Sequence, residues 1–104
     1  MIKHCVFIKF SDMTSLQQRN ELYRAIHNLR QHMSGWLGFV AGANVTPEPG
    51  MDKGFNGGFI IDFDNISARD NYLADARHQL IGAQIVDAAV GGIDGVMVFD
   101  IDQS

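Results

Sequence analysis

Residues 1–10 read MIKHCVFIKF, and their alternation indicates an extended strand rather than a helix. One side of such a strand carries Ile2, His4, Val6, Ile8 and Phe10, and the other carries Lys3, Cys5, Phe7 and Lys9. Both sides include apolar residues, so the sequence predicts a strand that is covered on both of its faces.

A helix is predicted next, because apolar residues recur at helical spacings until a Ser-Gly pair at 34–35 ends the run. Thr14 or Ser15 is expected to cap its N-terminus, with Gln17 or Gln18 completing a capping box. The predicted apolar stripe of this helix consists of Leu16, Leu22, Ile26, Leu29 and Met33.

Three further strands and a second helical region are predicted from the alternation and from the positions of the glycines. The strands cover 36–45, 55–64 and 95–101, and a loop containing proline and glycine covers 46–54. The helical region lies between the last two strands. This βαββαβ order is that of the split βαβ arrangement, which predicts an α+β, ferredoxin-like protomer with a four-stranded antiparallel sheet.

The second helical region is expected to begin at Ser67 as N-cap, with Asp70 as the acid of its first turn. The helix is predicted to run through residues 71–80, which read NYLADARHQL, and a second helical piece covers 80–89. Two glycines at 91–92 then break the helical pattern before the last strand.

The length of 104 residues predicts a single domain over 1–104. The net charge of −4 and the scattered basic residues argue against a nucleic-acid surface.

No apolar run approaches the roughly 20 residues that span a bilayer, and no signal-peptide pattern is present at the N-terminus. The single Cys5 cannot form an internal disulfide, which predicts a reducing, cytoplasmic location.

The helices can cover only one face of the predicted sheet, and the other face needs a partner. That second face carries apolar side chains from the first and last strands, including Cys5, Phe7, Met97, Phe99 and Ile101. A large apolar patch on a sheet marks a partner surface. The simplest partner is a second copy of the chain, so the sequence predicts a homodimer with two-fold symmetry that packs sheet against sheet.

Segments spread along nearly the whole chain occur in an order shared with a known family. They are MIKHCVFIKF at 1–10, KGF at 53–55 leading into a strand, the series Phe63, Tyr72 and His78-Gln79, and VMVFDI at 96–101. Together they resemble the stress-responsive dimeric α/β-barrel (Dabb) family. The resemblance implies a ferredoxin-like protomer whose sheets close into a barrel across a homodimer. It also implies that most relatives have no established activity, and some plant relatives are stress-induced.

A plant enzyme related to this family cyclises a polyketide intermediate without a cofactor, and its catalytic His and Tyr match His78 and Tyr72. The resemblance thus implies an acid/base role for His78 and a hydrogen-bond donor in Tyr72. The family pattern Tyr-x-x-His-Pro-x-His is changed here, because Asp75 and Ala76 replace its first His and its Pro. The cyclase also has a histidine where this chain has Gly57, and glycine there is expected to enlarge the pocket and to remove a hydrogen-bond donor.

The residues themselves suggest a polar stripe of Tyr72, Asp75 and His78. Because steps of three residues lag by about 60° on an ideal helix, Tyr72 and His78 are about 120° apart and need a bend, a long reach or an intervening molecule to meet, unless the helix ends near His78. Asp75 is expected to orient one ring nitrogen of His78 and to raise its pKa. Tyr72 would donate a hydrogen bond to a developing enolate oxygen. His4, on the strand face that meets the helices, is expected at the rim of the same pocket.

Each of these residues also has a structural interpretation. His78 fits a hydrogen bond to a backbone carbonyl at a helix end, and Tyr72 fits a packed ring. Asp75 fits a solvated partner of Arg77, and His4 fits a strand-edge residue without a chemical role.

Three functions follow from these interpretations. The first is binding of a small hydrophobic or aromatic molecule near Tyr72 and His78. The second is a cofactor-free lyase, cyclase or isomerase that acts on a polyketide-like carbonyl compound. The third is a monooxygenase of the wider dimeric-barrel group, either cofactor-free or haem-using. The sequence contains no nucleotide-binding motif and no metal-ligand spacing, so neither a cofactor nor a metal is predicted.

Overall fold

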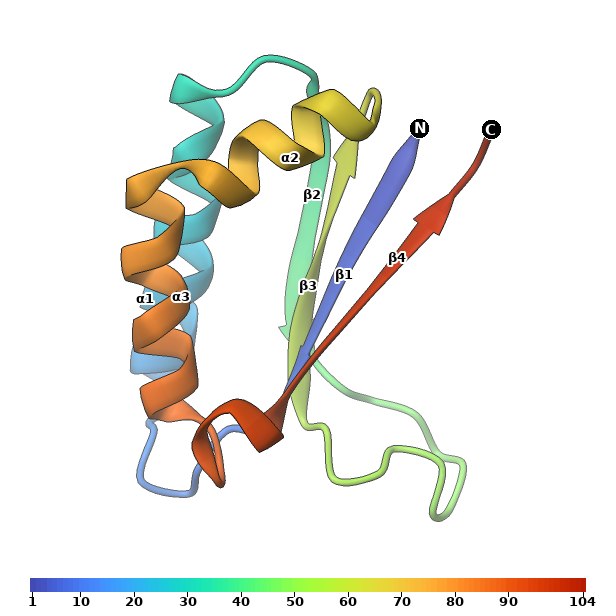
Figure 1. Cartoon of the computed structure of the whole chain (residues 1–104). Coiled ribbons are helices and arrows are strands. Elements are labelled where there is room, and N and C mark those ends of the chain that lie inside the picture. Colours follow the sequence, from blue (N-terminus) through green and yellow to red (C-terminus); the bar gives the residue numbers. More distant parts are fainter.

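The computed structural model describes residues 1–104 as an α+β fold with its helices on one side of a single sheet (Figure 1). The strands are β1 (Ile2–Ile8), β2 (Trp36–Ala43), β3 (Gly57–Phe63) and β4 (Val96–Asp102). The helices are α1 (Leu16–Asn28), α2 (Ile66–Ala74) and α3 (Ala76–Ala88), with short 3₁₀ turns at Leu29–His32 and Gly92–Gly95. The predicted fold class is confirmed.

The sheet has the order β2-β3-β1-β4, and all neighbouring strands are antiparallel. Because β1 lies between β3 and β4, His4 is opposite Ile61 on one side and Asp100 on the other. Residues paired in this way project from the same face of a sheet. The register therefore places a carboxylate beside His4, although the two residues are at opposite ends of the chain.

The first helix begins as the sequence predicts. The hydroxyl of Ser15 accepts a hydrogen bond from the Gln18 backbone N–H, and the Gln18 side chain accepts one from the Ser15 N–H, which completes the capping box. The predicted stripe is wrong at Leu16, which is exposed, whereas Tyr23 is buried. Leu16 lies six residues before Leu22, about 120° away from it around the helix, and so leaves the buried face.

The second helical region differs from the prediction at its start and in its middle. Asn65, not Ser67, is the N-cap of α2, because its side chain accepts a hydrogen bond from the Ala68 N–H. The helix then ends at Ala74, and Asp75 adopts an extended backbone with φ −70° and ψ 130°. The short side chain of an aspartate competes well for backbone N–H groups, and here Asp75 caps the new helix α3.

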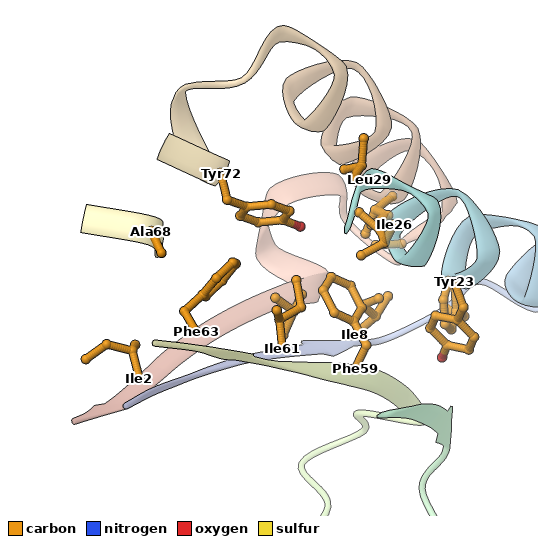
Figure 2. Close-up of a cluster of buried hydrophobic side chains, with 14 residues drawn as sticks. Ile2, Ile8, Tyr23, Ile26, Leu29, Phe59, Ile61, Phe63, Ala68 and Tyr72 are labelled. Atoms are coloured by element: carbon orange, nitrogen blue, oxygen red, sulfur yellow. The ribbon is translucent and has the colours of Figure 1, made fainter. Parts of the chain in front are cut away.

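The core fills the space between the sheet and the helices. Figure 2 shows Phe59, Ile61 and Phe63 rising from β3 toward the side chains of α1 and α2. Tyr72 of α2 lies above them and is completely buried, and Ile26 of α1 is only 1% exposed. The core thus encloses the polar hydroxyl of Tyr72 among hydrocarbon groups.

The opposite face of the sheet carries no helix. Large apolar side chains there are exposed, among them Val40 on β2 and Phe99 on β4. We call this surface the open face. None of the helices combines the length and the apolar character that crossing a bilayer requires.

Candidate functional site

A cavity of about 380 Å³ lies between α3 and the β1–β4 side of the sheet. It exists because the helices leave β4 partly uncovered, so that Val98 is exposed on the helix-facing side of the strand. The cavity walls are mostly apolar and include Val6, Ile26, Phe59, Ile85, Val96 and Val98. Its polar lining includes the side chains of His4, His78 and Asp100.

The structure brings Tyr72 and His78 into contact beside this cavity. Their ring centroids are 4.2 Å apart, with an angle of 43° between the rings. The predicted requirement for a bend is met at Asp75, where α2 gives way to α3. Tyr72 is 0% exposed, and in Figure 2 its hydroxyl points into the core on the side of Ile26. His78 itself lines the cavity.

The polar atoms of this pair have no partners. The Tyr72 hydroxyl and His78 Nδ1 are both buried and make no hydrogen bond. Buried polar groups in folded proteins are nearly always hydrogen-bonded, so two adjacent exceptions require an explanation. A water molecule or a ligand oxygen is the kind of partner that buried polar groups take when the protein supplies none.

Burial sets the protonation states of the two residues. It raises the pKa of Tyr72, so the hydroxyl keeps its proton far above neutral pH. Burial also lowers the pKa of His78, against a smaller opposing effect of the Leu73 carbonyl, so the imidazole is neutral at neutral pH. The predicted increase in the pKa of His78 is therefore wrong, because loss of water outweighs the attraction of Asp75.

Asp75 is occupied by local contacts. Its carboxylate accepts a hydrogen bond from the Arg77 backbone N–H at 2.8 Å and two from the Arg77 guanidinium, at 3.1 and 2.8 Å. The guanidinium and the backbone N–H groups of Arg77 and His78 hold the pKa of this carboxyl far below its usual range. Asp75 therefore starts α3 and pairs with Arg77, from a position between the two helices rather than within one.

His4 is buried and belongs to a chain of polar contacts. Its Nδ1 lies 2.7 Å from Oδ1 of Asp100, and Oδ2 of Asp100 accepts a hydrogen bond of 2.9 Å from Arg69. A carboxylate only accepts, so Nδ1 of His4 carries the proton and Nε2 is the nitrogen left for a ligand. The His4 ring also packs edge-on against Tyr72, with 5.7 Å between centroids.

Sequence reasoning missed Asp100 and Arg69. The signal for Asp100 is present in the sequence, because this charged residue continues the alternation of Val96 and Val98 after four apolar residues at 96–99. Its partner could not be read in the same way, since His4 and Asp100 are 96 positions apart and only the β1–β4 pairing brings them together.

The expectation that Gly57 enlarges the pocket is wrong. A Cβ atom on Gly57 would lie 2.5 Å from the Tyr23 hydroxyl and 3.0 Å from the Phe10 ring, so the space is already filled. The Tyr23 hydroxyl accepts a hydrogen bond from the Gly58 N–H at 3.1 Å and donates one of 3.3 Å to the Gly42 carbonyl. Tyr23 has thus taken the position that a larger residue at 57 would need.

Two further features concern metals and thiols. The structure contains no group of three His, Cys, Asp or Glu side chains placed to hold a metal ion. Cys5 is a buried free thiol on the open face of the sheet, and burial raises its pKa. It lies away from the cavity and takes no part in the site.

Comparison with known proteins agrees with the fold. Residues 2–103 match the family described as the Stress responsive A/B Barrel Domain. A dimeric ferredoxin-like protein of unknown function from Jannaschia sp. CCS1 is 23% identical, with a TM-score of 0.86 and coverage of 97% of each chain. A protein from Arabidopsis thaliana is 22% identical, with a TM-score of 0.85 and coverage of 100% of this chain and 96% of that one.

A third solved structure, the hydroxynitrile lyase from Passiflora edulis, is 15% identical with a TM-score of 0.79, covering 99% of this chain and 94% of that one. No protein of curated function matches the sequence significantly. At these identities the structural likenesses show a shared fold. The family match spans nearly the whole sequence and agrees with the element order, so the chain belongs to the stress-responsive α/β-barrel domain family.

Proposed function

We propose that the protein binds a small, largely apolar or aromatic molecule in the cavity between α3 and β4, with an oxygen atom of that molecule directed at Tyr72 and His78. The observation that supports this function is the pair of unpartnered buried atoms, the Tyr72 hydroxyl and His78 Nδ1. An unsatisfied buried polar group costs about 1–3 kcal/mol. A ligand oxygen that reached both atoms would recover that free energy on binding.

The cavity lining favours a particular class of ligand. The volume of about 380 Å³ is at the small end of the range of ligand sites, roughly 300–1,000 Å³. Walls such as Val6, Ile26 and Ile85 suit an aromatic ring or a short alkyl chain. The polar end of the lining is formed by His78, His4 and Asp100, and the Tyr72 ring lies behind it in contact with His78. A phenol of modest size, whose hydroxyl can both accept and donate a hydrogen bond, therefore fits the lining better than a charged metabolite, and a ketone could accept a hydrogen bond from Tyr72 alone.

Binding can be tested by titrating the protein with a panel of phenols and aromatic ketones while chemical shifts are followed by NMR. Tyr72→Phe and His78→Phe are each expected to weaken binding by roughly tenfold, which corresponds to about 1.4 kcal/mol. His27→Phe is the control, because His27 stacks on Phe39 at 4.6 Å and does not line the cavity. Equal affinity in all three variants, or shifts confined to another surface, would contradict the proposal.

Acid/base catalysis is the second candidate function, and the opposite pKa shifts of Tyr72 and His78 favour it. A neutral imidazole can accept a proton from the carbon next to a carbonyl group, and the C–H electron pair then forms an enolate. The protonated hydroxyl of Tyr72 can donate a hydrogen bond to the enolate oxygen. A cofactor-free lyase, cyclase or isomerase would use this step.

That step predicts exchange of the ketone's α-hydrogen for deuterium in heavy water, measured by NMR. Exchange should be faster with the wild-type protein than with His78→Phe, and His27→Phe should match the wild type. If the ketone binds but its α-hydrogen does not exchange faster, the protein binds the ketone without catalysing this step.

We also infer that the protein works as a homodimer. Dimeric ferredoxin-like relatives have the same fold, and the open face exposes apolar residues that a second copy would cover. Sedimentation at several concentrations tests this inference, and a monomer at micromolar concentration would contradict it.

A further inference from the structure

One glycine of α3 lies where neither the backbone nor the packing of the protomer requires a glycine. Gly82 is in the interior of the helix Ala76–Ala88, and it has no positive φ that would favour glycine. Nothing lies within 4 Å of the position that its Cβ would take. Glycine is less favourable than alanine inside a helix, because it loses more conformational freedom on folding. Gly82 therefore makes α3 less stable without any local gain.

Gly82 is at the centre of the helix face that borders the cavity between α3 and β4. The residues of α3 that line this cavity are His78, Gln79, Gly82, Ile85 and Val86. At about 100° per residue they span an arc of roughly 120° around the helix, and Gly82 lies in the middle of it. The missing side chain at this position therefore widens the cavity.

No neighbouring part of the protein uses the space beside Gly82. The helix α1 packs against α3, but none of its atoms lies within 4 Å of the Cβ position. The open face, where the inferred second copy would pack, is on the other side of the sheet from α3 (Figure 1). A molecule in the cavity is the remaining group that would use this space.

The wall of the cavity at Gly82 is formed by backbone alone. On the strand side of the cavity, Val98 of β4 is 56% exposed in the protomer, so the gap in front of it is not filled. A planar ring can place one face on the helix backbone and the other on β4, whereas an alkyl chain contacts only a strip of each wall. The space beside Gly82 therefore suits a ring better than a chain.

The separation of Gly82 from the polar end of the cavity fits the same ligand. Gly82 follows His78 by four residues, which is about one turn and about 6 Å along the helix axis. This distance is close to the length of a phenol ring. A phenol whose hydroxyl lies at His78 would therefore have its ring beside Gly82 and a para substituent directed toward Ile85 and Val86.

We propose that Gly82 is a specificity-determining residue, because its missing side chain admits an aromatic ring between α3 and β4 and so selects phenols over straight-chain alcohols. This role rests on the proposed binding function and narrows its ligand from apolar molecules in general to those that contain a ring. A larger side chain at position 82 would occupy the place of the ring itself.

The test compares two ligands of different width, para-ethylphenol and n-hexanol, by NMR titration. The wild type should bind the phenol more tightly. Gly82→Ala should weaken binding of the phenol relative to the alcohol by roughly tenfold, because an added methyl group crowds a packed ring. Gly82→Leu should abolish binding of the phenol. Ala83→Leu is the control, since Ala83 is exposed and does not line the cavity, and it should bind as the wild type does.

The melting temperature of the free protein gives a second readout. Gly82→Ala should raise it by roughly 4–8 °C, because alanine is the better helix former and its Cβ meets no neighbour. A lower melting temperature would mean that the protomer itself requires the glycine, which would overturn the inference. An unchanged ratio of the two affinities in Gly82→Ala would also overturn it, while the binding function would stand. If the wild type binds neither ligand, the proposed binding function is refuted together with the role of Gly82.

Discussion

Tyr72 and His78 lie on consecutive helices, and their ring centroids are 4.2 Å apart because Asp75 interrupts the helix between them. On a continuous helix the two side chains would point about 120° apart. The interruption brings a phenolic hydroxyl and an imidazole nitrogen to one buried place, where no hydrogen bond satisfies either.

Tyr72→Phe should leave the free energy of unfolding unchanged or increase it by up to about 1–3 kcal/mol, because it removes a buried hydroxyl that has no partner. Tyr23→Phe is the matched control, since the Tyr23 hydroxyl bonds to the backbone of Gly58 and Gly42. This second change should lower stability by about 1–3 kcal/mol. Urea unfolding of both variants measures the contrast. A loss in Tyr72→Phe as large as that in Tyr23→Phe would mean that a bound water serves Tyr72.

His78 should make stability depend on pH in a definite direction. Its pKa is lowered by burial, so as the pH falls through about 6.5 the unfolded chain takes up a proton before the folded chain does. The stability that the neutral imidazole contributes is complete above about pH 6.5 and is lost as the pH falls toward the folded pKa. His78→Phe should flatten this part of a stability–pH curve, and His27→Phe should not. A curve of unchanged slope in His78→Phe would contradict this assignment.

Two substitutions at Asp75 separate its cap from its charge. Asp75→Asn keeps a good N-cap for α3 but loses the ion pair with Arg77, whereas Asp75→Ala loses both. We expect the alanine variant to be the less stable of the two in thermal unfolding. Because the pKa of Asp75 is lowered, its contribution is present above about pH 4 and is lost as the pH falls further. The asparagine variant should lack that acid-side loss.

The contact between His4 and Asp100 predicts one tautomer of His4. With Nδ1 2.7 Å from the carboxylate, the neutral ring should carry its proton on Nδ1, a state that long-range proton–nitrogen NMR identifies. Asp100→Leu, which cannot accept a hydrogen bond, should shift the tautomer balance toward Nε2. Arg69→Lys should preserve the wild-type spectrum, because it retains a cation near Asp100. An Nε2-protonated ring in the wild-type protein would contradict this arrangement.

Local patterns in the sequence were sufficient to predict most of the fold. Alternation in residues 1–10 marks β1, and the Ser15–Gln18 box marks the start of α1, because both depend on neighbours within a few positions. The same reasoning failed at Asp75 and Asn65. An aspartate inside a helical pattern and an asparagine before it are compatible with a continuous helix, until hydrogen bonds to nearby backbone N–H groups decide otherwise.

The candidate site was predictable only in part, for a physical reason. Tyr72 and His78 are near in sequence, so their proximity needed only a bend. The His4–Asp100 contact depends on strand register, and the pKa of His78 depends on how much water the whole fold removes. Neither quantity is contained in a local pattern.

β4 carries Val98 in the cavity wall on one side and Phe99 on the open face on the other. A dimer contact that holds Phe99 in place would also hold Val98, because the two residues are neighbours on one strand. β4 would therefore link the open face to the cavity wall. Ligand affinity should then fall when the protein is diluted below its dimer dissociation constant, and a saturating ligand should in turn tighten the dimer by the square of that factor, because each dimer has two cavities. The concentration of the protomer would then control the fraction of cavities that hold a ligand.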